Sequence, residues 1–281
     1  MKLIKEENVL TKEKKAPFTI YGFTITNLLT YFVIYSVIGY IIETVFGILT
    51  KGVWESRKSF LYGPFCAIYG IGAVVMIVGL QHFKKNNYTL FIGGFFIGSI
   101  VEYIISWVGE MLFHIKWWDY SSMPFNLNGR ICIWFSFFWG ILAIYLMSHF
   151  NPKVDKFLEK FPPKVLTSVT IILVVIMYLD SCITGFALRM LYTRLANDYD
   201  LELQGVDSYL ETYTELYKNP KVKETVDTLF NDEVMIKAFP NIKVTDKKGN
   251  TIWVCDIFKN IQPYYIKFFT PRIPHTENFM N

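Results

Sequence analysis

Residues 36–70 read SVIGYIIETVFGILTKGVWESRKSFLYGPFCAIYG, and this stretch decides the fold class. An apolar helical run carries one carboxylate, Glu43, and gives way to a short basic loop. The pair Gly63 and Pro64 then opens a second apolar run. About fourteen apolar or small residues precede Glu43 and roughly two helical turns follow it, so its carboxylate is expected at membrane depth. Because an ionisable group is costly there, it indicates a functional site.

The composition indicates an integral membrane protein. Hydrophobic residues make up 52% of the 281 residues and aromatic residues 18%, and the mean hydropathy is +0.30. A soluble chain of this length would interrupt its apolar stretches with charge more often. The net charge of +4 is spread over the loops between apolar stretches, so we expect a lipid bilayer around the chain and no nucleic-acid partner. The four cysteines form no CxxC pair and the four histidines share no ligand spacing, so we expect neither a metal site nor a cofactor.

The apolar stretches predict an all-α polytopic membrane protein with about five transmembrane helices. The predicted spans are 28–50, 64–82, 89–113, 130–149 and 165–188. They divide the chain into a polar basic amino-terminal segment (1–27), a transmembrane helical domain (28–188) and a carboxyl-terminal extramembrane domain (189–281).

The carboxyl-terminal domain is predicted to be small and of mixed α+β type. The stretch 197–238 is expected to form two helices that are interrupted near Asn219 and Pro220. Residues 242–257 are expected to form a β-hairpin around a polar turn.

Basic residues predict the orientation in the cell membrane. The larger share of lysines and arginines falls on the side of the amino terminus, including the segment before the first span. This bias predicts a multi-pass protein whose amino terminus is cytoplasmic.

Polar residues of the predicted helices gather toward one membrane face. Odd-numbered spans run in one direction and even-numbered spans return, so the late carboxylates and the loops that follow them meet at that face. Glu102, Ser106 and Glu110 share one helix stripe because they are four residues apart. The candidate pocket residues are Glu43, Arg57, Glu102, Glu110, Asp119, Asn128, Arg130 and Asp180.

Two interpretations of these carboxylates remain open. Arg57 and Arg130 could neutralise some of them in structural ion pairs, as is usual for buried charges. A surplus of carboxylates would instead suit a cation, a proton or a substrate amine. If the pocket works in this way, Glu43→Gln or Glu102→Gln should impair function and leave membrane insertion intact.

The stretch 114–130 also has two interpretations. Its tryptophans are typical of the aromatic belt at a membrane interface. That belt does not account for the nearby Asp119, Asn128 and Arg130, which could line the mouth of a cavity.

These motifs together resemble a bacterial family of membrane proteins described as putative ABC transporter permeases, or putative ABC-transporter type IV proteins. The similar segments are YSVIGYIIETVFG, RKSFLYGPFCAIYGIGAV, EYIISWVGEMLF, WWDYS and NLNGRICIWFSFFWG, within about residues 30 to 150. The matching positions are Glu43, Arg57, Gly63, Pro64, Tyr69, Gly70, Glu102, Glu110, Trp118, Asp119, Asn128, Gly129 and Arg130. Ala67 departs from the pattern, in which proline is expected, and so does the Lys58–Ser59 pair.

The resemblance implies the membrane-spanning component of a transporter for an unknown small molecule or cation. The chain contains no GxxxxGK[ST] phosphate loop, so such a component would need a separate ATP-binding subunit. Residues 151–165 would be its docking element, although they could equally form an interfacial helix only. The alternative is a non-translocating substrate- or ion-binding or sensory membrane protein. We expect no enzyme, because the sequence has no GxSxG, no HExxH and no Cys–His spacing.

Overall fold

The computed structural model of the chain describes residues 18–113, 115–258, 261 and 265–267. The predicted polar segment 1–27 therefore lies partly outside the described residues, and so does most of the stretch after residue 258.

Four helices among the described residues are long and apolar enough to cross a membrane. They are α1 (Ile25–Lys51), α3 (Asn87–Phe113), the continuous run Ile133–Leu158 and α6 (Pro163–Asp198). The run Ile133–Leu158 consists of α4 (Ile133–Tyr145), a π-helical segment η2 (Leu146–Phe150) and α5 (Asn151–Leu158). The predicted class of a multi-pass α-helical membrane protein is confirmed.

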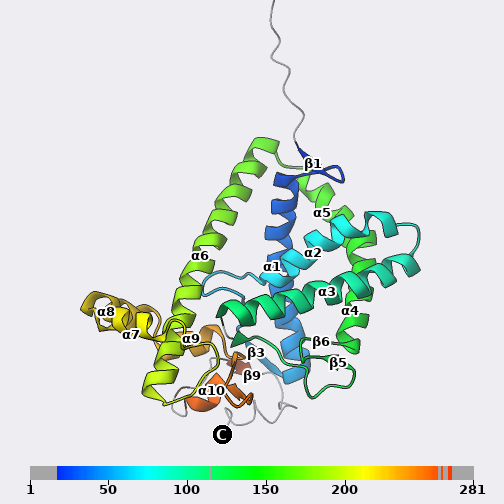
Figure 1. Ribbon diagram of the computed structural model, residues 1–281. Coiled ribbons are helices and arrows are strands. Elements are labelled where there is room, and N and C mark those ends of the chain that lie inside the picture. The colour runs from blue at the N-terminus through cyan, green and yellow to red at the C-terminus, as the bar shows by residue number, and fades with distance from the viewer. Residues whose placement is uncertain (1–17, 114, 259–260, 262–264, 268–281) are drawn as a thin grey trace, which may run out of the picture.

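The second predicted span differs from the other four because only part of it is helical. It contains α2 (Ala67–Gly79) and the 3-10 helix η1 (Leu80–Phe83), which together are shorter than the four long helices. At its start, the amide of Cys66 donates to the carbonyl of Ser36, halfway along α1, at 2.8 Å. At its end, His82 packs edge-to-face on Tyr21, close to the beginning of α1. Helix α2 therefore starts beside the middle of α1, and it runs obliquely from there to the side of the molecule where α3 begins (Figure 1).

Residues 52–66, which we call the re-entrant loop, connect the end of α1 with the start of α2 beside the middle of α1. Non-helical backbone is tolerated at membrane depth only where protein or a water-filled cavity satisfies its polar groups. The loop turns at Gly63, whose φ of +71° favours glycine. The amide of Ser59 donates to the carbonyl of Phe65 at 2.8 Å, and the amide of Ala67 donates to the hydroxyl of Ser59 at 2.9 Å. The two departures from the family pattern, at 58–59 and at 67, therefore contact each other. A proline at 67 would not make this contact, because it has no N–H to donate.

Small residues bring the helices of this domain close together. Gly70 of α2 lies directly against Ser36 and the carbonyl of Phe32 on α1. Gly94 and Gly98 of α3 lie against α4 in the same way, as expected for a GxxxG spacing. Helix α6 leans on α1, where the hydroxyls of Thr30 and Thr170 are 2.9 Å apart.

The carboxyl-terminal domain is built around the end of α6. This helix is 36 residues long, roughly 54 Å, and exceeds the roughly 30 Å thickness of a bilayer core. It continues ten residues beyond the predicted end of the fifth span, and its last turns are buried among three shorter helices. These are α7 (Leu210–Lys218), α8 (Pro220–Leu229) and α9 (Asp232–Ala238).

The predicted features of this domain are largely present. The helical break at Asn219 and Pro220 is confirmed, with the Asn219 side chain capping α8. The predicted hairpin is formed by β7 (Lys243–Thr245) and β8 (Thr251–Trp253), which pair antiparallel and lead into α10 (Val254–Ile257). The stretch 197–238 contains three helices where two were predicted.

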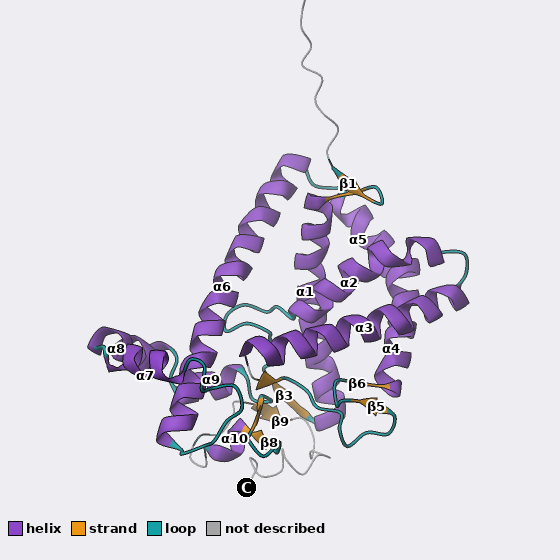
Figure 2. Cartoon of the chain, in the orientation of Figure 1, coloured by secondary structure: helices purple, strands orange, loops and turns teal. Residues whose placement is uncertain are grey.

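Short strands fasten the membrane-domain loops to the carboxyl-terminal domain. Strand β3 (Val53–Glu55) pairs with β9 (Tyr265–Lys267), and β4 (Ile115–Lys116) pairs with β7. Strands β3 and β9 lie at the same end of the molecule as β8, the neighbour of β7 (Figure 2). Two further pairs of strands are hairpins, β1 (Thr19–Ile20) with β2 (Phe23–Thr24), and β5 (Asn126–Leu127) with β6 (Ile131–Cys132).

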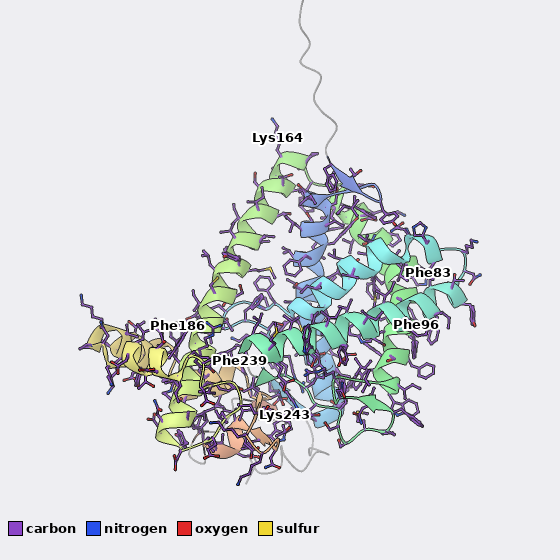
Figure 3. The ribbon with its side chains drawn as sticks, in the orientation of Figure 1. Phe83, Phe96, Lys164, Phe186, Phe239 and Lys243 are labelled. Atoms are coloured by element: carbon purple, nitrogen blue, oxygen red, sulfur yellow. The ribbon has the colours of Figure 1, made fainter. Side chains whose placement is uncertain are left out.

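The two faces of the molecule are therefore distinct. We call the end where α1 begins the amino-terminal face and the end that holds the small domain the carboxyl-terminal face. Figure 3 shows Lys164, at the start of α6, on the amino-terminal face, and Phe239 and Lys243 at the opposite end. The predicted gathering of loops and tail at one face is present in the structure.

Candidate functional site

The eight predicted pocket residues fall into five groups, each held by different partners. The two predicted stripes do face the interior: Ser36 and Gly39 are buried on α1, and Glu102 and Ser106 are buried on α3. The carboxylates on them, however, do not share one set of contacts.

Glu43 belongs to an ion-pair chain that leads to the carboxyl-terminal domain. Its Oε1 accepts a hydrogen bond from the hydroxyl of Tyr69 at 2.8 Å, and its Oε2 lies 3.9 Å from Nη1 of Arg57. Arg57 makes a closer pair with Glu55, at 2.9 Å, and Glu55 also pairs with Lys51 at 2.9 Å. Although burial alone raises the pKa of Glu55, the positive charges of Lys51 and Arg57 outweigh it and hold that pKa below its usual value. The group is therefore an alternating series of charges that neutralise one another.

Glu102 is in a different environment, because its described partners are neutral. It lies midway along α3 and is only 4% exposed. Oε1 accepts from the hydroxyl of Tyr120 at 3.0 Å, and Oε2 accepts from the indole N–H of Trp139 at 2.8 Å. Among the described residues, no lysine, arginine or histidine is within salt-bridge distance of it.

Glu110 is paired at the carboxyl-terminal face. Its carboxylate lies 2.6 Å from Nη2 of Arg130, and Arg130 also donates to the hydroxyl of Ser106 at 3.2 Å. The side chain of Asn128 donates to the hydroxyl of Tyr103 at 2.9 Å, and the ring of Tyr103 lies beneath the Arg130 guanidinium. The Glu110–Arg130 pair fits the structural interpretation that the sequence left open.

The loop after α3 is held by its own polar residues. The indole N–H of Trp118 donates to the carbonyl of Arg130 at 2.9 Å, and Asp119 accepts from the amide of Ser121 at 2.9 Å. Gly129 has a φ of +66° and leaves room for Asp119 and Ser121, which a Cβ there would meet. Aromatic residues of this loop also serve as hydrogen-bond donors, Trp118 to the carbonyl of Arg130 and Tyr120 to the buried Glu102, and both interpretations of the loop stay open.

Asp180 holds the re-entrant loop and does not join the other carboxylates. Both of its oxygens lie 3.2 Å from the amide nitrogen of Tyr62, and Oδ1 accepts from the hydroxyl of Thr184 at 3.3 Å. Thr184 in turn accepts from the amide of Leu61 at 2.8 Å. The side chain of Lys58 donates to the carbonyl of Leu61 at 2.6 Å. Gly63 and Pro64 follow at once and form the turn that returns the chain to α2.

We expect Asp180→Ala to loosen the re-entrant loop. The change leaves the amide of Tyr62 and the hydroxyl of Thr184 without an acceptor, at a cost of about 1–3 kcal/mol each. Thermal unfolding in detergent should begin at a lower temperature, and mass spectrometry after thiol labelling should show faster modification of the buried Cys66 at the end of the loop. Ser181→Ala is the matched control, because the exposed Ser181 hydroxyl bonds only within α6. Unchanged Cys66 labelling in Asp180→Ala would contradict the anchoring role.

A family model described as "Putative ABC-transporter type IV" matches residues 30–185 of the chain. The match covers more than half of the sequence. The chain belongs to this family. No curated protein and no solved structure matches the chain significantly.

The ABC-transporter type IV match covers all five groups of predicted pocket residues and leaves out most of the carboxyl-terminal domain. The resemblance was expected to cover about residues 30–150, and the match extends it through most of α6, including Asp180 and Thr184. The Asn241 side chain, which donates to Glu55 at 2.9 Å, lies outside the matched range.

A cavity lies between α1, α2 and α4, and its described lining is apolar. The lining residues are Tyr35, Ile38, Gly39, Ile42, Tyr69, Ala73, Met76, Trp139, Leu142, Leu146 and Phe150. No carboxylate is among them. Glu43 and Glu102 lie behind this lining, bonded to the polar ends of Tyr69 and Trp139. Among the described residues, no three His, Cys, Asp or Glu side chains are grouped so that they could hold a metal ion.

The partners that define these groups were not predicted from the sequence. Trp139 and Tyr120 were not singled out as ligands of Glu102, nor Glu55 and Asn241 as parts of the Arg57 group. A usable signal was the position of Trp139, because tryptophans of membrane helices concentrate at the interfaces and this one lies well inside a span.

Proposed function

We propose that the chain is the membrane-spanning component of a transporter and that Glu102 is the centre of its substrate or ion site. The supporting observation is the set of contacts of Glu102, which are neutral and leave its carboxylate without a basic partner among the described residues. A buried carboxylate in such surroundings is costly unless a positive charge or a proton accompanies it. A cation, a proton or a substrate amine supplies that charge.

Glu43 is the second member of the proposed site. Its Tyr69 partner packs against Trp139, with ring centroids 5.8 Å apart, so the Glu43 and Glu102 contacts adjoin each other. The carboxylate of Glu43 lies 3.9 Å from the guanidinium of Arg57. A bound cation would therefore compete with Arg57 for this carboxylate. The other predicted pocket residues act as supports of the site, and the proposal assigns no catalytic reaction to the chain.

The proposal includes a separate ATP-binding subunit on the cytoplasmic side. With the amino terminus in the cytoplasm, α5 and its connection to α6 lie on that side. Phe157 and Phe161 are exposed there and are flanked by lysines, which suits either a docking element or an interfacial helix. In this orientation, the carboxyl-terminal domain is extracytoplasmic.

Purification in a mild detergent from the native host, followed by mass spectrometry, tests this assignment. We expect a stoichiometric ATP-binding protein to co-purify with the chain, and Phe157→Ser together with Phe161→Ser to reduce its recovery. Phe96→Ser on the lipid-exposed side of α3 is the control for general loss of exposed aromatic surface. Repeated preparations without such a subunit would overturn the ATP-driven assignment and favour a binding or sensory membrane protein.

A further inference from the structure

Helices α1 and α4–α5 are in contact toward both faces of the helical domain, and the apolar cavity lies between these contacts. Toward the amino-terminal face, the hydroxyl of Tyr35 donates to Asn151 at 3.1 Å and the helices are tied together. Toward the other face, the rings of Phe46 and Phe135 meet with centroids 6.4 Å apart. Phe46 follows Tyr35 by eleven positions, which corresponds to roughly 16 Å along the helix. The apolar cavity lies within this interval, and α2 forms its floor.

The flanks of this cavity face the surroundings of the helical domain. Ile41 on α1 is 54% exposed and Ile141 on α4 is 49% exposed, and each adjoins a residue of the lining, Ile42 and Leu142. Because both helices are long and apolar enough to cross a membrane, these surroundings are the hydrocarbon of the bilayer. We call the cavity the lateral window.

The polar ends of the aromatic side chains in the window point away from it. Tyr69 donates to Glu43, Trp139 donates to Glu102 and Tyr35 donates to Asn151. A buried water needs about two to four polar partners, and the remaining lining of isoleucine, leucine, alanine and methionine side chains offers none. An empty space there would forfeit dispersion contacts on one side of every lining residue.

The helix at the rim of the window also departs from regular geometry. Leu146 and Phe150 begin and end the π-helical segment η2, and both line the window. π-Helical turns are rare and are frequent at functional sites. This segment is a second feature that singles out the window from the other lipid-facing surfaces of the domain.

We propose that the lateral window is a binding site for one acyl chain of a membrane phospholipid. The acyl chain enters from the bilayer between α1 and α4 and packs on the faces of Tyr69 and Trp139. Because Tyr69 and Trp139 donate hydrogen bonds to Glu43 and Glu102, the bound acyl chain also fixes the positions of both carboxylates. The lipid site does not depend on the proposed transport function.

Photo-crosslinking of the full chain tests this site. The protein is reconstituted in phosphatidylcholine vesicles that contain a phospholipid with a diazirine in one acyl chain, irradiated, digested and mapped by mass spectrometry. We expect labelling at Ile38 and Ile42 to exceed, several-fold, labelling at Ile172 and Val175 on the exposed side of α6. Equal labelling of both surfaces would overturn the proposal, because the window would then be ordinary lipid-facing surface.

A pair of neighbouring substitutions provides the matched control. Leu142→Trp fills the window, and Ile141→Trp adds the same bulk to the adjacent lipid-facing position. We expect loss of labelling at Ile38 and Ile42 in the first variant and retention in the second. Retained labelling in a folded, monodisperse Leu142→Trp protein would overturn the proposal. If that variant does not fold, Ile38→Phe and Ile41→Phe form the same comparison from α1, read at Ile42.

Discussion

Gly70→Ala is expected to destabilise the helical domain by about 1–3 kcal/mol, the cost typical of overpacking a core. A Cβ at this position would meet the hydroxyl of Ser36 and would lie 2.6 Å from the carbonyl oxygen of Phe32. The contact is with helix backbone, so the strain cannot be relieved by a side-chain rotation. Relief requires α2 to move away from α1 at the point where the re-entrant loop ends.

Gly72→Ala in the same helix is the matched control. A Cβ at Gly72 meets nothing within 4 Å, and alanine is favoured over glycine within a helix by roughly 0.5–1 kcal/mol. We therefore expect the two variants to shift the midpoint of thermal unfolding in detergent in opposite directions. Equal shifts would contradict the close approach of α1 and α2 at Gly70.

The long helices could be predicted from the sequence because their signal is local. The apolar runs of α1, α3, α4–α5 and α6 are each long enough to span a bilayer, and length and composition are sufficient to recognise them. The run at 64–82 has the same composition, yet its first residues form a turn at half depth. That outcome depends on the acceptor that Asp180 provides to Tyr62, 118 residues away in sequence, and no local pattern encodes such a contact.

The candidate site could be predicted in part. The stripes on α1 and α3 follow from helical periodicity, and both face the interior. Periodicity does not specify which carboxylate an arginine neutralises. Arg130 pairs with Glu110, and Arg57 lies closer to Glu55 than to Glu43. With both arginines paired in this way, Glu102 has no basic partner among the described residues. The packing of the helices determines these pairs, so the sequence pattern alone could not predict them.

Glu102→Gln is expected to abolish function and to preserve membrane insertion and folding. The amide has nearly the same shape as the carboxylate and keeps one oxygen acceptor for Tyr120 or Trp139, but it cannot carry negative charge. If Glu102 holds a cation, a proton or a substrate amine, the variant loses the attraction on which the site depends. A loss of at least about tenfold in transport rate corresponds to ~1.4 kcal/mol.

The measurement is complementation of a deletion strain of the native host, compared by growth and by the profile of small molecules inside and outside the cells. Glu110→Gln is the matched control, since it removes a carboxylate from the same helix stripe. Its expected effect is on stability, because Arg130 loses the partner that lies 2.6 Å away, and the deletion phenotype should still be rescued. Rescue by Glu102→Gln would place Glu102 among the structural carboxylates and overturn the proposed site. Failure of Glu110→Gln alone, with a stable protein, would move the site toward the Arg130 group at the carboxyl-terminal face.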